Sequence, residues 1–342
     1  MTLSGKKVIV FGGTGSLGRA LVRRLSIDNH LILFSRDEAK HWTIKNQLTH
    51  KNNVEFVVGD IRDDVRVKET LIRYKPDAII IASALKQVDT CEMSPYESVQ
   101  TNILGIRNVL NAVTHQAHLL GDLDAVLMVS TDKACAPANV YGMCKAVAER
   151  LVTSTCITME QGPRFVGVRY GNVLESRGSI IPLFRHQGEF QSHFTVTHPE
   201  MTRFIMTLDQ SIDLIVSTIL GAKSVEMWLP KLKSMNIMDL AEIFSERYHK
   251  PIKIIGIRPG EKLHEDLISR PESVRVREEG GFYKMSPAHT DIPLDAKTFD
   301  YSSDQDVLSK QELAAYLDRI GIFTRSMDTF VGIEIEEIKT SQ

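Results

Sequence analysis

Four side chains that can move protons stand in one short stretch, STDKACAPANVYGMCK, residues 130–145. Asp132 and Lys133 put a carboxylate beside an ammonium, and Tyr141 and Lys145 follow at the spacing Tyr-x-x-x-Lys. That spacing is one helical turn, so the ammonium can stabilise a phenolate whose reference pKa is about 10. These residue types suit proton removal from an alcohol combined with a second acid–base step. The alternatives are a solvated ion pair on a loop and an ordinary helix surface.

The position of this stretch in the chain favours an active site. Short β-branched apolar segments alternate with amphipathic segments of helical length, which predicts an α/β fold with a Rossmann-type, doubly wound parallel sheet. Ligands of such sheets bind at the carboxyl ends of the strands. Thr131 follows the fifth strand at that edge, where it can donate to a substrate hydroxyl. The expected strands are residues 7–11, 31–34, 54–58, 78–82, 125–129 and 165–169, and the expected helices are residues 16–28, 63–74, 94–116 and 139–159.

The alternation of strands and helices breaks after residue 171, which indicates a second part of the chain. Residues 1–171 are expected to form the nucleotide-binding domain, and residues 205–230 return to it as a helix and a strand. Residues 172–204 and 231–325 are expected to form a small C-terminal α/β substrate lobe. Residues 326–342 are expected to be a flexible tail, although their alternating apolar and acidic residues also allow an edge strand.

Composition excludes several classes of function. With 41 basic and 43 acidic residues the net charge is −2, which gives no general attraction to nucleic acid or to an anionic membrane. The four cysteines form no Cys-x-x-Cys pair and the eleven histidines show no metal-ligand spacing, so no metal site is expected. The chain enters a predicted strand at once, and no apolar run reaches the roughly 18 residues of a membrane span. A cytoplasmic protein without a secretory leader is therefore expected.

A glycine-rich turn follows the first predicted strand and opens a helix, in the segment VIVFGGTGSLGRAL. Glycines allow a tight turn and let a pyrophosphate approach the backbone N–H groups at the helix N-terminus. This context indicates a dinucleotide site, and the alternative is a glycine turn without a ligand. The expected cofactor contacts at this turn are Gly12, Thr14, Gly15, Ser16, Leu17 and Gly18.

Ser35 and Arg36 stand where NAD-binding proteins commonly place an acidic residue, at the end of the second strand. A guanidinium there suits a 2′-phosphate, so NADP is the expected cofactor. Asp60, after the third strand, is expected near the adenine amino group, with a helix N-cap as its alternative role. The other expected cofactor contacts are Ile61, Ala82, Ala84 and Lys86, together with Tyr141 and Lys145; Lys86 is expected near the nicotinamide.

Taken together, these motifs resemble one enzyme family. GGTGSLG, GDIRD, STDKA…YGMCK, RYGNVLESRGSIIPLF, EMTRF and IRPGEKLHE resemble an extended short-chain dehydrogenase/reductase, over roughly residues 5–325. Within that group the chain is similar to the soluble UDP-N-acetylglucosamine 4,6-dehydratases, particularly the branch that inverts C5. It has Tyr141 where some members carry Met, and it lacks the membrane region of the long forms. The Asp-Lys pair separates this group from simple sugar 4-epimerases.

The resemblance implies a redox-neutral cycle. Tyr141, helped by Lys145 and Thr131, would take the C4 hydroxyl proton while bound NADP+ accepts the C4 hydride. Lys133 would then remove the C5 proton and Asp132 would protonate the departing C6 hydroxyl, although this division of roles stays open. Return of the hydride to C6 and protonation of C5 from the opposite face would give an inverted 4-keto-6-deoxy sugar. The implied contacts to the UDP-sugar are Lys86, Asn172, Arg177, Ser179, Arg258 and Glu261.

Several alternatives stay open at this point. Arg177 and Arg203 could instead form structural ion pairs at the lobe interface. A UDP-hexose 4-epimerase would share the fold, the cofactor and the Tyr-Lys pair, but would not need Asp132 and Lys133. A non-catalytic NADP sensor would be expected to lose Tyr141 or Lys145. Relatives form dimers or hexamers, so a homo-oligomer is expected.

Overall fold

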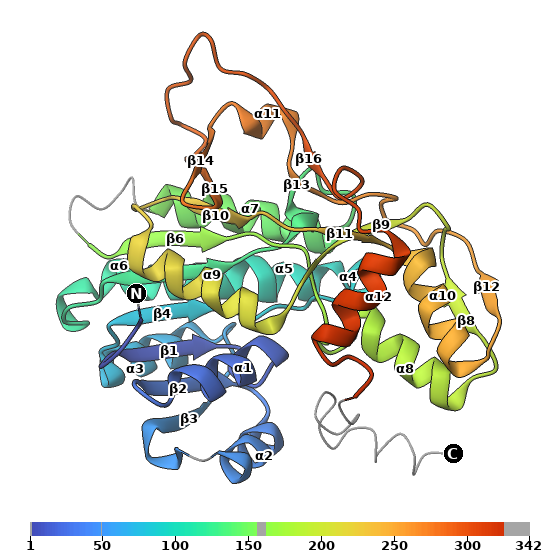
Figure 1. Ribbon diagram of the computed structural model, residues 1–342. Coiled ribbons are helices and arrows are strands. Elements are labelled where there is room, and N and C mark those ends of the chain that lie inside the picture. Colours follow the sequence, from blue (N-terminus) through green and yellow to red (C-terminus); the bar gives the residue numbers. More distant parts are fainter. Residues whose placement is uncertain (1, 49, 156–161, 325–342) are drawn as a thin grey trace. The chain divides into compact units, whose positions relative to one another are not determined.

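The computed structural model describes residues 2–48, 50–155 and 162–324 (Figure 1). The predicted tail, residues 326–342, lies outside this part of the chain. The described residues divide into two compact units. The first unit comprises Met1–Tyr170, Asp209–Lys231 and Asp266–Asp300, and the second comprises Gly171–Leu208, Leu232–Glu265 and the described part of Tyr301–Gln342.

A nine-stranded sheet forms the centre of the first unit, in the order β14-β15-β10-β6-β5-β4-β1-β2-β3. The strands from β10 to β3 run parallel, which confirms the predicted Rossmann-type doubly wound sheet. The chain order reverses between β1 and β4, and ligands of such sheets bind at this switch point. The bounds are β1 (Lys7–Phe11), β2 (His30–Ser35), β3 (Val54–Val58), β4 (Ala78–Ile81), β5 (Ala125–Val129), β6 (Arg164–Val168), β10 (Met227–Pro230), β14 (Val276–Glu279) and β15 (Phe282–Met285).

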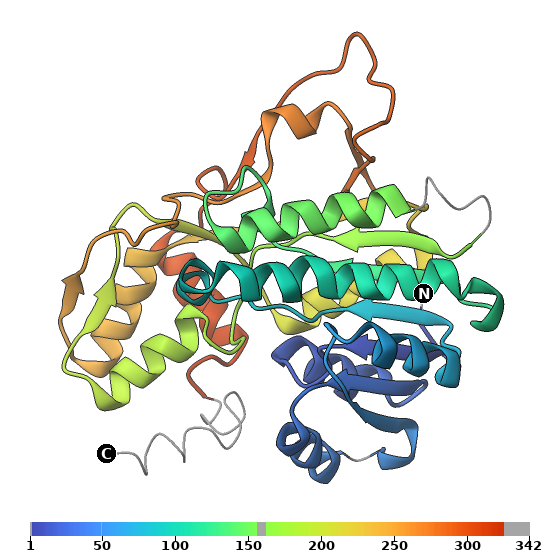
Figure 2. The ribbon, with the colours of Figure 1, turned by 180° about the vertical axis from the view of Figure 1, so that it is seen from behind.

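Helices cover both faces of this sheet, so its central strands are apolar on both sides and fully buried. In Figure 1, α1 (Ser16–Leu25) and α9 (Leu208–Gly221) lie on the near face. Figure 2 shows the opposite face, covered by α3 (Asp64–Tyr74), α6 (Gly105–His115) and α7 (Val140–Thr155). The core on that side joins alternate strand residues such as Ile9 and Val126 to Val109 of α6 and Val152 of α7.

The remaining elements of the first unit are short. The predicted helix over residues 94–116 is present as three successive segments, and a π-helical turn separates α5 from α6. The predicted helix over residues 139–159 is described as far as Thr155. The bounds are α2 (Glu38–Gln47), η1 (Lys51–Asn53), α4 (Val88–Met93), α5 (Pro95–Val99), the π-turn η2 (Gln100–Leu104), η3 (Ala117–Leu119), η4 (Asp132–Ala134), β13 (Asp266–Ile268) and α11 (Arg270–Ser273).

The second unit has its own apolar core, in which Phe184, Phe194 and Phe244 contact one another edge to face. Its strands form a three-stranded sheet, β11-β9-β7, and a two-stranded sheet, β12-β8. The bounds are β7 (Asn172–Val173), α8 (Ile180–Phe190), β8 (Phe194–Val196), β9 (Thr202–Met206), β11 (Ser234–Asn236), α10 (Ile237–Tyr248), β12 (Ile252–Ile254), β16 (Tyr301–Ser302) and α12 (Lys310–Arg319).

One predicted boundary is wrong. The substrate lobe was expected to include all of residues 231–325, but residues 266–300 belong to the first unit. The physical reason is strand pairing: β15 joins β10 antiparallel at the sheet edge, in the register Met227↔Met285 and Pro230↔Phe282, and β14 then pairs with β15. An antiparallel hairpin added to a parallel sheet leaves no mark in the strand–helix alternation that the sequence shows.

Candidate active site

The acid–base loop, which we define as residues 130–135, begins where β5 ends. Backbone hydrogen bonds hold it against the strand next to β5. The Ser130 N–H donates to the Val168 carbonyl at 2.7 Å, and the Asp132 N–H donates to the Tyr170 carbonyl at 3.0 Å. Backbone pairing beside β5 therefore continues as far as Asp132, and the loop lies at the carboxyl edge, where the sequence placed it.

Asp132 is a buried carboxylate with only one of its oxygens in use. Its side chain is 1 % exposed, and its Oδ1 accepts hydrogen bonds from Thr131 Oγ1 at 2.9 Å and Lys133 Nζ at 3.1 Å. Its Oδ2 is buried and has no hydrogen-bond partner among the described residues. A buried polar atom without a partner is costly and rare. The pair is therefore not a solvated surface ion pair, and Oδ2 is available to a ligand group.

Helix α7 packs closely against the acid–base loop. Asn139 precedes the helix, and its Oδ1 accepts a hydrogen bond from the Gly142 N–H at 2.8 Å. A Cβ atom at Gly142 would lie 2.1 Å from the Lys133 carbonyl oxygen. Only glycine permits this approach, which brings Tyr141, the residue before it, next to the Asp132–Lys133 pair.

The phenol of Tyr141 is buried, and burial raises its pKa to about 12. The Lys133 charge and a hydrogen bond with Thr131 lower it, and the Asp132 charge raises it. The expected lowering of this pKa is therefore wrong for the protein by itself, because desolvation of the phenolate outweighs the nearby cation. These contacts bring Thr131, Asp132, Lys133 and Tyr141 together.

Lys145 lies one turn further along α7, and its ammonium donates to the Val129 carbonyl at 2.6 Å. Burial lowers the pKa of Lys145 to about 8, and the Glu149 charge acts in the opposite direction. In this arrangement Lys145 holds the end of β5, while Lys133 is the cation that lowers the pKa of Tyr141. From the sequence, we expected Lys145 to be the cation that stabilises the Tyr141 phenolate.

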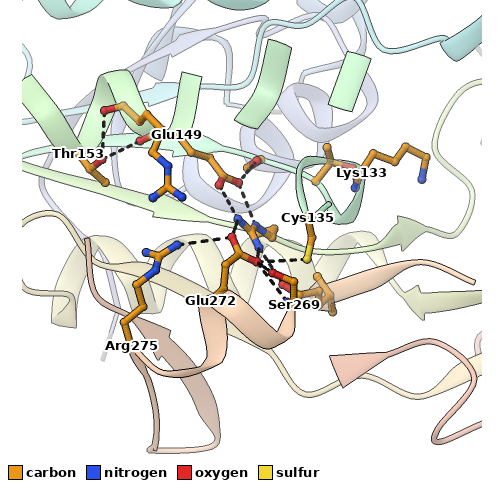
Figure 3. A network of polar contacts seen from close by, with 12 residues as sticks. Lys133, Cys135, Glu149, Thr153, Ser269, Glu272 and Arg275 are labelled. Carbon is orange, nitrogen blue, oxygen red and sulfur yellow. Dashed lines mark hydrogen bonds and ion pairs between the residues drawn. The ribbon is translucent and has the colours of Figure 1, made fainter. Parts of the chain in front are cut away.

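A largely buried ion cluster lies beside the loop (Figure 3). The Arg169 guanidinium donates five hydrogen bonds, to both oxygens of Glu149, both oxygens of Glu272 and the Leu267 carbonyl. These satisfy all of its N–H donors. Burial alone would raise the pKa of Glu272, but the charge and hydrogen bonds of Arg169 lower it to about 2. Removing one member of such a cluster typically costs about 3–5 kcal/mol of folding free energy.

The glycine-rich turn has the close contacts that a dinucleotide cradle needs. Gly12 has a φ of +86°, and a Cβ atom there would lie 2.7 Å from the Ser83 nitrogen. A Cβ atom at Gly18 would lie 2.3 Å from the Gly13 carbonyl oxygen. Helix α1 begins at Ser16, just after the turn, and has no acidic residue in its first turn. An anion bound at its N-terminal N–H groups would therefore meet no competing carboxylate from the first turn. Thr14, Gly15 and Leu17 lie in the same turn.

Ser35 ends β2 and is held by two side chains. Thr14 Oγ1 donates to Ser35 Oγ at 3.1 Å, and His41 Nε2 lies 2.9 Å from the same oxygen. Burial lowers the pKa of His41, so its ring is neutral near pH 7. Arg36 follows, and its side chain is 60 % exposed. The two residues expected to contact the adenosine ribose therefore offer a fixed hydroxyl, from Ser35, and an accessible guanidinium, from Arg36.

Asp60 lies beside two guanidinium groups. Its Oδ2 accepts from Arg62 Nη2 at 2.7 Å and lies 3.6 Å from Arg36 Nη1. Burial would raise the pKa of Asp60, but the hydrogen bonds and charge of Arg62 outweigh it and lower that pKa. The alternative role of Asp60 as the helix N-cap is wrong, because Asp63 caps α3 by accepting from the Arg66 N–H at 2.9 Å.

The segment after β4 is fixed by a buried amide. Asn102, in the π-turn η2, accepts from the Leu85 N–H at 3.0 Å and donates to the Leu85 carbonyl at 2.8 Å. This holds the backbone directly before Lys86, which is exposed. Ile61, Ala82 and Ala84 lie in the loops after β3 and β4, on the same sheet edge as the acid–base loop.

The expected substrate residues fall in the second unit, apart from Lys86. Asn172 Oδ1, in β7, and Ser179 Oγ, at the N-cap of α8, are buried and have no hydrogen-bond partner among the described residues. Arg177 lies in the loop between β7 and α8. Arg258 pairs with Glu261 at 3.0 Å, which neutralises part of its charge.

Arg203 is a structural residue of the second unit. It is buried, and it donates to the carbonyl oxygens of Thr202, Lys262 and Leu263, with Glu265 at 3.9 Å. These contacts favour the structural alternative that the sequence left open.

Sequence reasoning missed the buried charges around the loop and the residues around Ser35 and Asp60. The signals available were weak: Arg169 follows the apolar run FVGV, and Glu149 continues the i, i+4 series of Tyr141 and Lys145 on α7. Glu272 and Cys135 are 137 residues apart, and only the fold brings them together. The missed residues are His41, Arg62, Asn102, Glu149, Arg169 and Glu272.

Two kinds of relatives resemble the chain in sequence. An uncharacterized membrane protein from Methanocaldococcus jannaschii is 36 % identical over 330 residues, which cover 92 % of this chain and 96 % of the relative. Among the described residues, however, no helix is both long and apolar enough to cross a membrane. A protein named UDP-glucose 4-epimerase from Rickettsia typhi is 35 % identical over 306 residues, covering 87 % of this chain and 85 % of the relative.

Solved structures show the same fold. Pen from Bacillus thuringiensis matches with a TM-score of 0.87 and 32 % identity, over 95 % of this chain and 100 % of that chain. A dTDP-glucose 4,6-dehydratase from Streptomyces venezuelae matches with a TM-score of 0.65 and 19 % identity, over 75 % of this chain and 86 % of that chain. The family model described as "Polysaccharide biosynthesis protein" matches residues 8–287. The chain therefore belongs to the polysaccharide biosynthesis protein family and has the Rossmann-type fold of nucleotide-sugar epimerases and dehydratases.

Proposed function

We propose that the chain is a UDP-N-acetylglucosamine 4,6-dehydratase that inverts C5, and that it forms a UDP-4-keto-6-deoxy-N-acetylhexosamine. The observation that carries this proposal is the buried Asp132–Lys133 pair beside Tyr141, with Asp132 Oδ2 unpartnered among the described residues. Oxidation of an alcohol needs one base. Elimination of water across C5 and C6 needs in addition a base at C5 and an acid at the C6 oxygen.

We infer that the cofactor of the first unit is NADP. The cradle at Gly12 and Gly18 leaves no room for a side chain, and the α1 N-terminus offers N–H groups to a pyrophosphate. Arg36 and the Ser35 hydroxyl would hold the 2′-phosphate, and Asp60 would lie near the adenine. When bound, such a nucleotide would supply the hydride acceptor for C4 and the hydride donor for C6.

The proton steps fall to the side chains of the first unit. Tyr141, with Thr131 and Lys145, takes the proton of the C4 hydroxyl. The resulting ketone at C4 acidifies the C5 proton. A proton passes from the Lys133 ammonium to Asp132 within the pair, which leaves a neutral amine and a carboxylic acid. The Lys133 amine then removes the C5 proton, and Asp132 protonates the C6 hydroxyl so that it leaves as water; Asp132 Oδ2, unpartnered among the described residues, is available for this task. A proton from solvent then reaches C5 from the opposite face, which completes the inversion.

The second unit is proposed to hold the UDP-sugar. Asn172 Oδ1 is a buried acceptor that a sugar hydroxyl would satisfy, and the buried Ser179 hydroxyl can donate to a diphosphate. Arg177 and Arg258 would supply positive charge for the diphosphate. Glu261 pairs with Arg258 and would accept from the uridine ribose.

A UDP-hexose 4-epimerase is the second candidate, because a relative at 35 % identity carries that name. An epimerase returns the hydrogen to C4 and has no use for an acid and a base at C5 and C6. The buried pair therefore favours the dehydratase.

Incubation with UDP-N-acetylglucosamine and mass spectrometry of the products tests the proposal. A dehydratase gives a nucleotide sugar lighter by one water. An epimerase gives a new sugar of unchanged mass, and a non-catalytic sensor gives no product. Either of these last two outcomes would refute the dehydratase.

The exposed guanidinium at position 36 predicts the cofactor preference. Arg36→Ala should weaken NADP+ binding by about tenfold or more and leave NAD+ binding nearly unchanged, because only NADP+ carries the 2′-phosphate. Calorimetric titration with both nucleotides measures this. Arg24→Ala, an exposed arginine near the end of α1 that pairs with Asp213, is the matched control. Equal losses for the two nucleotides at Arg36→Ala would show that Arg36 does not read the phosphate.

The lowered pKa of Lys145 predicts an alkaline limit to activity. Burial lowers this pKa from 10.5 to about 8, so the ammonium loses its proton as the pH rises through that value. If the charged form is required, kcat/KM should fall by about tenfold per pH unit above the pKa. Initial rates measured over a series of pH values give this alkaline decrease in kcat/KM. Constant activity up to the ordinary lysine value of 10.5 would exclude a role for the ammonium.

A further inference from the structure

One buried guanidinium is linked to both ends of the acid–base loop through two carboxylates. Arg169 is 1 % exposed and grips two carboxylates, Glu149 on α7 and Glu272 on α11. Glu149 Oε1 also accepts from Ser130 Oγ, at the start of the loop, at 2.5 Å. Glu272 Oε2 also accepts from Cys135 Sγ, at the end of the loop, at 3.2 Å. Figure 3 shows Glu149, Glu272 and Cys135 directed toward the centre of this network.

We propose that Arg169, Glu149 and Glu272 form a clamp that positions the acid–base loop, and that segment 266–300 serves catalysis by delivering Glu272 to it. The clamp is not part of the acid–base chemistry itself. This inference rests on the proposed function in one respect, namely that Asp132 and Lys133 carry out the elimination.

The bonding pattern supports positioning more than general packing. The hydrogen bonds of the two carboxylates to the loop fall at its two ends, at Ser130 for Glu149 and at Cys135 for Glu272. Glu272 is itself fixed, because its Oε2 accepts from Ser269 N at 3.2 Å and Ser269 Oγ at 3.0 Å. Burial raises the pKa of the Cys135 thiol well above its usual range, so the sulfur keeps its proton and remains a donor.

The geometry also predicts which chemical step depends on Glu272. Tyr141 and Lys145 are carried by α7, whereas Asp132 and Lys133 lie in the loop that Glu272 holds at its far end. Loosening the Glu272 end should therefore impair the elimination more than the oxidation at C4.

Glu272→Gln is the main test, and Glu226→Gln is its matched control. Glu226 is also a buried carboxylate of the first unit that binds a guanidinium from segment 266–300, Arg277. Its other hydrogen bonds are accepted from Lys223 N and Trp228 Nε1, outside the loop. Glu272→Gln should lower the dehydration rate at least tenfold and speed hydrogen exchange of the backbone amides of residues 130–135. Glu226→Gln should do neither, even if both variants lose thermal stability.

Substitution of Cys135 tests the far end of the loop without breaking the ion cluster. Cys135→Ala removes the donor to Glu272 and should speed exchange in residues 130–135 with a severalfold loss of dehydration. Cys135→Ser keeps a donor and should lose less than Cys135→Ala. This pair keeps the proposal testable if Glu272→Gln fails to fold.

Two results would overturn the clamp. One is wild-type exchange in residues 130–135 in Glu272→Gln or in Cys135→Ala. The other is an equal fall in dehydration for Glu272→Gln and Glu226→Gln at equal loss of stability. The exchange measurement needs no substrate, so it still tests the clamp if the wild-type protein releases no water. In that case the proposed function fails and the clamp is judged separately.

Discussion

Asp132→Asn and Lys133→Ala should separate oxidation from elimination. Both variants keep Tyr141, Lys145 and Thr131, so the hydrogen at C4 can still be removed, although more slowly in Lys133→Ala, which also loses the charge that lowers the pKa of Tyr141. The acid or the base for C5 and C6 is lost. The variants should stall before water leaves, and the absorbance of reduced nicotinamide should build up. The loss of dehydration should be about 10²–10⁴-fold, the usual effect of removing a general acid or base.

Lys133→Ala should also slow deuterium uptake at C5 in D2O, because Lys133 is the base proposed for that proton. The control is Lys233→Ala, which breaks an ion pair with Asp306 in which both side chains are more than half exposed. Exposed pairs contribute only about 0–1 kcal/mol, so this control should keep full activity. Full dehydratase activity in Asp132→Asn and Lys133→Ala would reduce their pair to a structural contact.

Tyr141→Phe should abolish most of the oxidation at C4. The ring stays packed against the acid–base loop, but the hydroxyl that takes the proton is gone, and a fall of about 10²–10⁴-fold is expected. Single-turnover formation of reduced nicotinamide measures this step directly. Tyr74→Phe, which removes a phenol that donates to Glu55 at 2.9 Å in the same unit, is the matched control. Wild-type rates in Tyr141→Phe would exclude this residue as the base.

The sequence was sufficient for the parts of the site that depend on local order. Strand–helix alternation predicted the doubly wound sheet, and the rule that ligands bind at strand ends placed residues 130–133 at the carboxyl edge. The glycine turn was also predictable, because its tight contacts at Gly12 and Gly18 are properties of one short segment.

The features of the site that the sequence did not predict depend on contacts between segments distant in the chain. The role of Asp132 as an acid stays a prediction from the sequence. Its burial with one oxygen unpaired among the described residues follows from how the loop packs against β6 and α7. The pKa of Tyr141 was misjudged for the same reason, since burial outweighs the neighbouring cation. Segment 266–300 was placed in the wrong unit because its hairpin joins β10 through strand pairing. No local sequence pattern therefore indicated that Glu272 would contact the acid–base loop.

The fate of a deuterium label at C4 tests the central claim most directly. UDP-N-acetylglucosamine deuterated at C4 is incubated with the protein, and the product is examined by mass spectrometry and NMR. A 4,6-dehydratase moves the label within the sugar, so the product should be lighter by one water and carry the deuterium at C6. A product of unchanged mass with the deuterium still at C4 would contradict the account and establish a 4-epimerase.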